Sequence, residues 1–200
     1  MAIKTLSVKF TGFSPLLQNN PQGINPLNKL LKADQAANKK YKASKTDENF
    51  EAQSKTGIAL RLFWDDEMGV YIPTRWVLAQ IAKHSYKRCK VSKDNARAAV
   101  FTLKDKVKLS YDGDKKVKKL KDITKNTDFQ TMIFQKIKTA KVPKAMPIFH
   151  AWAFELELEY DNTIIDFEQL QDLLEYGAKY NGFGDFRPTY GRCIAEVTND

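Results

Sequence analysis

The stretch HAWAFELELEY, residues 150–160, alternates large apolar residues with polar ones without interruption. Successive side chains of a β-strand point to opposite faces of the sheet, so this alternation predicts a strand with two unlike faces. The apolar face carries Trp152, Phe154, Leu156, Leu158 and Tyr160, and the polar face carries Glu155, Glu157 and Glu159. A strand with one face in the core and one in water is typical of antiparallel sheets. We therefore expect the glutamates to lie on an exposed sheet face and to bind nothing.

Further alternating segments and two predicted helices with apolar faces supply the rest of the predicted core. Residues 3–10 alternate in the same way and predict a first strand. Thr74 is a suitable N-cap for a helix that ends near Arg88, and Asp166 with Gln169 forms a capping-box pattern for a second helix. The other predicted strands are a hairpin across DDEMG with arms at residues 58–64 and 70–72, and strands over residues 98–111, 129–138 and 192–198.

Two polar segments interrupt this pattern and are predicted to be insertions. Residues 18–55 are rich in Lys, Ala, Asn and Gln and favour exposed helices, whereas residues 110–128 are rich in lysine and favour a projecting loop or basic hairpin. Without them, the order of elements is βαββαβ. The sequence thus predicts the α+β class, with a ferredoxin-like or RRM-like core of an antiparallel sheet and two helices on one face. We expect one such domain over residues 1–200.

Charge is divided unevenly along the chain, whose formal net charge is +9. Residues 104–144 contain 13 lysines and 5 aspartates, whereas residues 145–176 contain 8 acidic residues and no lysine or arginine. Lysines that neutralise phosphates release counterions, so a basic segment of this kind favours a polyanionic partner. A solvated surface that keeps the protein soluble is the other interpretation.

Three of the nine glycines lie in YNGFGDFRPTYGRCIAEV, residues 180–197, between the last predicted helix and the last strand. This order excludes the dinucleotide-binding glycine motif, which follows a strand and opens a helix, and no Gly-Lys-Ser/Thr marks a P-loop. A C-cap at Gly182, a proline turn and a strand start explain the stretch structurally. Glycines also let a ligand backbone approach, arginines contact phosphates, and aromatic rings stack on unpaired bases. Residues 182–192, which we name the glycine loop, are therefore a candidate cradle for nucleic acid.

The last helix followed by GFGDFRPTYGRCIAEV resembles the glycine-rich loop of the RAMP superfamily, the ferredoxin-like RNA-binding subunits of CRISPR effector complexes. YIPTRWVLAQIAKHS, residues 71–85, resembles the start of their first helix, and the lysine-rich insertion resembles the thumb-like insertion of their backbone subunits. FTGFSPLLQNNP and GDFRPTYGR also resemble a group of small phage-encoded proteins of similar layout. The resemblance implies RNA binding within a larger assembly.

Together these features predict a non-catalytic protein that binds single-stranded RNA or DNA. We expect it to form a homo-oligomer along the strand or to join a larger complex. The residues predicted to contact nucleic acid are Arg187, Arg192, Phe186, Tyr190, Gly184 and Gly191 of the glycine loop, Lys115, Lys116, Lys118, Lys119 and Lys121 of the insertion, and Arg75, Lys87 and Arg88 of the first helix. We expect no cofactor and no metal, since neither the two histidines nor the two cysteines have metal-ligand spacing.

Two other functions are compatible with the sequence. A phage protein that mimics or blocks a CRISPR subunit would act through the acidic strand and residues 27–54. A RAMP-type processing ribonuclease would use His84, which has Tyr and Lys neighbours suited to acid–base catalysis, although a surface histidine explains the same residue. The acidic residues at 65–67 fit a hairpin turn better than a divalent-ion site.

Location follows from what the sequence lacks. No apolar run approaches the roughly 18 residues of a membrane-spanning helix. The start, MAIKTLSVKFTGF, alternates and has no basic and then apolar region of a signal peptide. The thiols of Cys89 and Cys193 are expected to be reduced. We therefore expect a cytoplasmic protein without a membrane partner, located in a bacterial host cell if it is phage-encoded.

Overall fold

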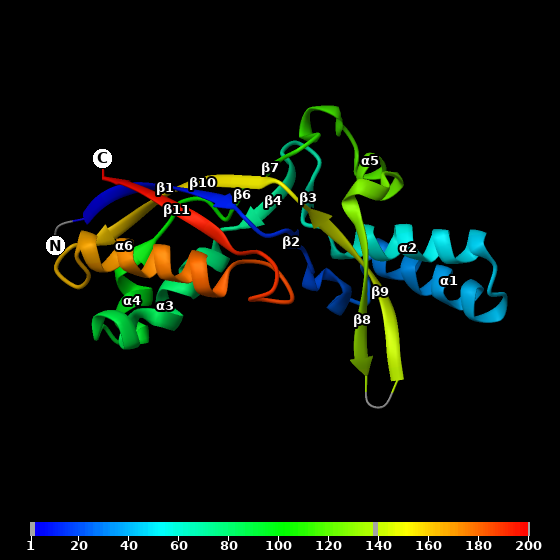
Figure 1. Ribbon diagram of the computed structural model, residues 1–200, viewed down its shortest axis with the longest axis horizontal. Coiled ribbons are helices and arrows are strands. Elements are labelled where there is room, and N and C mark those ends of the chain that lie inside the picture. The colour runs from blue at the N-terminus through cyan, green and yellow to red at the C-terminus, as the bar shows by residue number, and fades with distance from the viewer. Residues whose placement is uncertain (1–2, 138–139, 200) are drawn as a thin grey trace. The chain divides into compact units, whose positions relative to one another are not determined.

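The computed structural model describes residues 3–137 and 140–199, a mixed α+β chain with antiparallel sheets. The chain divides into two compact units (Figure 1). Unit 1 comprises Met1–Leu16, Tyr71–Asp112 and His150–Asp200, and unit 2 comprises Leu17–Val70 and Gly113–Phe149. Both segments predicted to be insertions fall in unit 2, apart from the first residues of the lysine-rich one.

Unit 1 is built on a sheet whose strands lie in the order β11-β1-β10-β5. These strands are β11 (Cys193–Asn199), β1 (Ile3–Gly12), β10 (Trp152–Asp161) and β5 (Val100–Phe101), and β7 (Ser110–Tyr111) also pairs with β10. Every pairing is antiparallel, and the register sets Val8 opposite both Leu156 and Val197. The first and last strands of the chain therefore pair side by side.

One face of this sheet forms the core of unit 1, as the alternation predicts. Leu6, Val8 and Phe10 have no exposed surface, and the rings of Phe10 and Phe154 stack with their centroids 4.8 Å apart. The helices α3 (Arg75–Cys89), α4 (Lys93–Ala99) and α6 (Phe167–Tyr176) lie on this side (Figure 1). The apolar side chains of both layers are thereby removed from water, which stabilises the unit.

The opposite face of the sheet is open and acidic. The side chains of Glu155, Glu157 and Glu196 are exposed there. Within the described strands, the one lysine among them is Lys9, which lies opposite Glu155 on β10 and Glu196 on β11. The prediction that the glutamates of β10 decorate an exposed sheet face is confirmed for Glu155 and Glu157, whereas Glu159 is half-buried.

The predicted capping signal is confirmed at α6, whereas at α3 only the predicted start of the helix is confirmed. In α6, Asp166 and Gln169 form the reciprocal capping box, with the Gln169 N–H donating to Asp166 at 2.8 Å. The helix continues through a π turn, η4 (Gly177–Asn181), and ends at Gly182, which has φ +71°. Thr74 is the N-cap residue of α3, but its hydroxyl donates to the Lys104 carbonyl at 2.6 Å and not to the helix.

Two predicted strands of the middle segment are wrong in detail. Residues 98–111 are not one strand, because the segment contains the end of α4, then β5, β6 (Lys106–Lys108) and β7. The first hairpin arm is also wrong, since residues 58–61 end helix α2 (Asp47–Arg61) and only β3 (Trp64–Asp65) pairs across the turn with β4 (Gly69–Pro73). Ile58, Leu60 and Leu62 alternate by two residues, yet the intervening Ala59 is also buried, as a packed helix end requires.

Unit 2 consists of a helical hairpin and a long β-hairpin. Helices α1 (Lys29–Ala43) and α2 run side by side (Figure 1), and both begin at predictable caps, Asn28 and Thr46. Strands β8 (Gln130–Ile137) and β9 (Ala140–Phe149) pair antiparallel, and β2 (Leu16–Leu17) extends the sheet on the β9 side. The strand predicted from residue 129 is confirmed up to residue 137, and residue 138 lies outside the described residues.

The lysine-rich insertion is packed where the sequence predicts a projecting loop or hairpin. It forms η2 (Asp114–Lys116), α5 (Leu120–Lys125) and η3 (Thr127–Phe129). Ile123 has no exposed surface, so α5 is anchored in unit 2. The Asp122 carboxylate accepts hydrogen bonds from the backbone N–H groups of Lys118 and Lys119, both at 2.9 Å, which lowers the pKa of Asp122. The burial of Ile123 and the hydrogen bonds to Asp122 stabilise α5 in a segment whose composition favours a loop.

Candidate nucleic-acid interface

The glycine loop of unit 1 is tied to the segment that follows β1. The Phe183 N–H donates to the Gly191 carbonyl, and the Gly191 N–H donates to the Pro15 carbonyl, each at 2.8 Å. The Arg192 N–H donates to the Ser14 hydroxyl at 2.8 Å. The base of the loop is therefore fixed from both sides.

Two of the loop glycines are required by this close approach of backbone to backbone. Gly191 has φ +76°, and a Cβ added to it would lie 1.8 Å from the Phe183 carbonyl oxygen. A Cβ on Gly182 would lie 2.5 Å from the Gly191 carbonyl oxygen. Gly184 also has a positive φ, +78°. The backbone contacts at the base of the loop therefore leave no room for a side chain at Gly182 or Gly191, which explains why both residues are glycine.

The arginines of the loop are exposed, and one of them lies over an aromatic ring. Arg187 and Arg192 are exposed, and the guanidinium carbon of Arg192 lies 5.4 Å from the centre of the Phe13 ring. Phe13 is itself 52 % exposed, so ring and guanidinium present a joint surface to solvent. Among the described residues, the Arg187 side chain has no hydrogen-bond or ion-pair partner.

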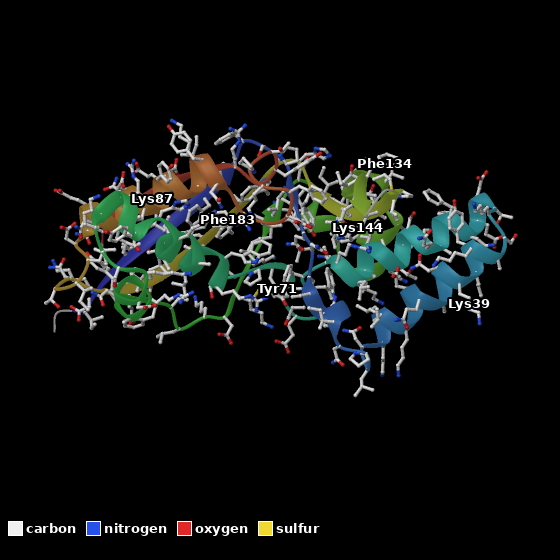
Figure 2. All side chains as sticks on the ribbon, turned by 90° about the horizontal axis from the view of Figure 1, so that it is seen from below. Lys39, Tyr71, Lys87, Phe134, Lys144 and Phe183 are labelled. Atoms are coloured by element: carbon white, nitrogen blue, oxygen red, sulfur yellow. The ribbon has the colours of Figure 1, made fainter. Side chains whose placement is uncertain are left out.

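The aromatic residues of the loop divide into buried and accessible ones. Phe183 is 1 % exposed, and its ring packs edge-on against Phe10 and Phe154 at centroid distances of 5.0 and 5.4 Å (Figure 2). Phe186 and Tyr190, which the sequence predicts to contact nucleic acid, are half-buried. Phe13 was missed by sequence reasoning, because it precedes the loop by more than 160 residues and only the fold brings it there.

The predicted basic residues of α3 do not form one cluster. Arg75 and Lys87 are exposed, but they lie at opposite ends of the helix, about 18 Å apart along its axis. Arg88 donates from Nε to the Asp172 carboxylate at 2.8 Å and again from Nη2, and its guanidinium lies 4.6 Å from the centre of the Tyr176 ring. The Arg88 guanidinium also lowers the pKa of Asp172. Arg88 is therefore held on α6.

His84, the one candidate for acid–base chemistry, lies in the contact between α3 and α6. Its ring packs edge-on against Tyr176 at 5.1 Å, and its Nε2 has no hydrogen-bond partner in the described part of the chain. Burial lowers the pKa of His84, and the nearby charges of Lys83 and Lys87 lower it further. Burial and the neighbouring cations therefore both favour the neutral imidazole.

The predicted lysines of unit 2 gather around the start of α5. Lys115, Lys116, Lys118, Lys119 and Lys121 are all exposed. Three of them, Lys118, Lys119 and Lys121, line an open cavity of about 610 Å³ together with Asp66. Asp66 also accepts a hydrogen bond from the Trp64 indole at 2.8 Å, and the Asp65 carboxylate accepts from the N–H groups of the turn. The acidic residues at 65–67 therefore do belong to the hairpin turn.

Two further observations concern the described residues only. Residues 3–137 and 140–199 contain no group of three or more His, Cys, Asp or Glu side chains that could hold a metal ion. None of the helices described is both long enough and apolar enough to cross a membrane. Comparison with known proteins found no match, either to a protein-family model or to a curated protein.

Proposed function

We propose that unit 1 is a ferredoxin-like, RAMP-like module that binds single-stranded nucleic acid at the glycine loop without acting on it chemically. The βαββαβ arrangement sets its fourth strand beside the first, the first beside the third, and the third beside the second. The order β11-β1-β10-β5, with α3 and α6 as the two helices, supports this assignment.

The proposal rests on one observation: the backbone of the glycine loop is held by hydrogen bonds, while its arginine side chains are exposed. Hydrogen bonds to Pro15 and Ser14 hold the loop, while Arg187 and the Arg192–Phe13 pair remain exposed. Arginine side chains contact phosphates and aromatic rings stack on unpaired bases, so this surface has the two components of single-strand binding. A surface that is already ordered also avoids the entropy loss of ordering a loop on binding.

The open sheet face of unit 1 is not the proposed path of the strand. Glu155, Glu157 and Glu196 would repel phosphates there, and Lys9 is the one lysine among them in the described strands. The exposed lysines beside α5 give unit 2 a basic surface of its own, and we propose that it contributes salt-dependent affinity.

The test measures binding of labelled single-stranded oligouridine and oligothymidine by fluorescence anisotropy over a range of salt. We expect affinity to fall steeply with salt, and the Arg187→Ala/Arg192→Ala variant to lower the slope of log affinity against log salt by about 0.7 for each phosphate that is no longer neutralised. The control Lys4→Ala/Lys108→Ala removes the same charge from exposed positions elsewhere in unit 1 and should leave the slope unchanged. Absence of binding by the unaltered protein at low salt would refute the proposal.

We propose binding without cleavage because His84 and its neighbours are engaged in the packing of α3 against α6. The ring lies against Tyr176, and the neighbouring Arg88 is bonded to Asp172. Incubation of the protein with a labelled structured RNA should leave the RNA intact. Cleavage that His84→Ala abolishes would instead assign a processing ribonuclease.

The acidic sheet face favours protein interaction as a second candidate function. A basic protein surface would complement Glu155, Glu157 and Glu196, as in other electrostatically matched interfaces. The immobilised protein should then retain a host protein after nuclease treatment, and Glu155→Gln/Glu157→Gln should lose it. If no retained protein depends on these glutamates, this candidate is discarded.

A further inference from the structure

Unit 2 contains a cavity of about 250 Å³ that none of the predicted site residues lines. Its polar lining includes Asp34, Asn38, Gln53 and Arg61, and its apolar lining includes Phe50, Met132, Val142 and Pro143. Lys144, labelled in Figure 2, also lines it. Pockets for drug-sized ligands span roughly 300–1,000 Å³, so this cavity suits a smaller group such as one planar heterocycle.

A nearly buried carboxylate forms one wall of the cavity. Asp34 is 8 % exposed, and its two oxygens accept hydrogen bonds from the Thr56 hydroxyl at 3.2 Å and from the Asn38 amide at 3.0 Å. The Asn38 oxygen accepts in turn from the Gln53 amide at 2.5 Å, which fixes the network. A carboxylate offers about four acceptor sites, so Asp34 retains two of them. Among the described side chains, which do not include those of residues 136–141, no lysine or arginine nitrogen lies within 4.0 Å of it.

A half-buried guanidinium forms another part of the wall. Arg61 Nη1 donates to the Gly57 carbonyl at 2.7 Å and to the Ala145 carbonyl at 3.2 Å. Nε and Nη2 have no hydrogen-bond partner among the described side chains, which leave out residues 136–141, so further N–H donors remain unused there. Burial lowers the pKa of Arg61 while the charge of Asp34 raises it, and arginine remains protonated in either case.

Gly57 in helix α2 makes room for the Arg61 guanidinium. A Cβ at this position would lie 2.6 Å from Arg61 Nη1 and 3.5 Å from an Asp34 carboxylate oxygen. Glycine within a helix is less stable than alanine by about 1 kcal/mol, so helix formation itself does not explain this residue. The accommodation of the guanidinium beside the carboxylate does explain it.

Asp34 and Arg61 therefore share a cavity, which Lys144 also lines, without forming an ion pair with each other. Each group is hydrogen-bonded by the protein but keeps unused hydrogen-bonding capacity, so the cavity suits a ligand that offers N–H donors to Asp34 and an acceptor to Arg61. We propose that it binds a guanine base. The N1–H and 2-amino groups would donate to the carboxylate, O6 would accept from the guanidinium, and Phe50, Met132 and Pro143 would cover the faces of the ring.

Guanine is the only common base with two adjacent N–H donors beside a carbonyl acceptor. Adenine and cytosine each offer one amino group next to a ring acceptor, and uracil offers one N–H between two carbonyls. A carboxylate accepts a bidentate pair of hydrogen bonds only from guanine, and interactions of this kind are short and strong. The cavity belongs to unit 2, so this inference goes beyond the proposed function and does not depend on the glycine loop.

Titration calorimetry with GMP, IMP, AMP, CMP and UMP tests the proposal on the full chain. We expect GMP to bind most tightly and IMP, which lacks the 2-amino group, to bind about tenfold more weakly, because it makes one hydrogen bond fewer to a charged group. Equal affinity for all five nucleotides, or no binding of GMP at millimolar concentration, overturns the proposal.

Asp34→Asn supplies the matched variant, and Glu48→Gln removes a carboxylate charge from an exposed position of α2 as its control. Asp34→Asn should bind both nucleotides more weakly and GMP no better than IMP, because the charged acceptor is lost, and a cooperative urea unfolding transition shows that the variant is folded. The control should keep the full preference for GMP. A GMP preference that survives Asp34→Asn contradicts the proposed contact.

The guanine can come from a free nucleotide or from a strand. Oligouridine with one central guanine should bind more tightly than oligouridine alone if the strand is the source, and the difference should vanish in Asp34→Asn. A protein that prefers GMP but shows no such difference takes the free nucleotide, which also supports the proposal. The Arg187→Ala/Arg192→Ala variant should retain GMP binding, so failure at the glycine loop can be distinguished from failure at this cavity.

Discussion

Gly191 in the glycine loop and Gly57 in helix α2 both stand where a Cβ would collide, but with different neighbours. At Gly191 the neighbour is the Phe183 carbonyl oxygen, 1.8 Å away, and the backbone has φ +76°. At Gly57 the neighbour is the tip of the Arg61 side chain, 2.6 Å away, and the backbone is helical. Backbone cannot move without breaking the loop, whereas a side chain can rotate. The same residue type therefore maintains structure in one region and a charged cavity in the other.

Gly191→Ala is expected to have the largest effect. The new methyl group would force the Phe183 carbonyl away and impose a strained φ, breaking the hydrogen bonds that close the loop. We expect the free energy of unfolding of unit 1 to fall by about 4 kcal/mol, near the upper end for single substitutions. Hydrogen exchange in β1 and β11 measures it, with exposed Thr189→Ala as the control in the same loop. Unchanged protection in both strands would contradict this assignment.

Gly12→Ala is the intermediate case, because the neighbour is a side chain that is packed. A Cβ on Gly12 would lie 2.2 Å from the Trp152 ring, which is 3 % exposed and donates its indole N–H to the Ser14 carbonyl at 2.8 Å. Overpacking of this kind lowers stability by about 1–3 kcal/mol. Urea unfolding, monitored through hydrogen exchange in β10, measures the loss in the free energy of unfolding. Trp152→Phe should recover part of it, and the neighbouring exposed Thr11→Ala should change little.

The sheet of unit 1 was largely predictable because its signals are local. Alternating residues in β10 and the Asp166–Gln169 cap of α6 depend on neighbours within a few positions. The strand predicted from alternation at residues 58–61 was wrong, because a helix end that is buried on several sides can show the same pattern as a strand. The prediction of a projecting loop for the lysine-rich insertion was wrong for a related reason. The burial of Ile123 is a tertiary contact that its polar sequence neighbours do not indicate.

The candidate sites were less predictable, since their contacts are distant in sequence. The arginines of the glycine loop were found from composition, but the partner ring of Arg192 is Phe13, and Arg192 bonds to a residue 178 positions away. Asp34 lies in a polar segment that the sequence predicts to be an exposed helix. Arg61 lies in a segment that the sequence predicts to be a strand. Their shared cavity exists only because α1 and α2 pair and strand β9 brings the Ala145 carbonyl to Arg61.

Gly57→Ala is expected to have the smallest effect on stability and so provides the sharpest contrast with Gly191→Ala. Alanine should stabilise helix α2 by about 1 kcal/mol. Displacement of the Arg61 guanidinium from the Gly57 and Ala145 carbonyls should remove a similar amount. The free energy of unfolding should therefore stay within about 0.5 kcal/mol of its original value, while GMP binding weakens because the guanidinium has moved.

The two opposing contributions at Gly57 can be separated with Arg61→Ala. When the guanidinium is absent, the Cβ at position 57 meets nothing closer than the Asp34 oxygen at 3.5 Å, so only the gain in helix stability remains. Gly57→Ala/Arg61→Ala should then be more stable than Arg61→Ala by about 1 kcal/mol in urea unfolding. An equal stability of these two variants would mean that Gly57 is constrained by the helix backbone, as Gly191 is by the loop, and not by the charge beside it.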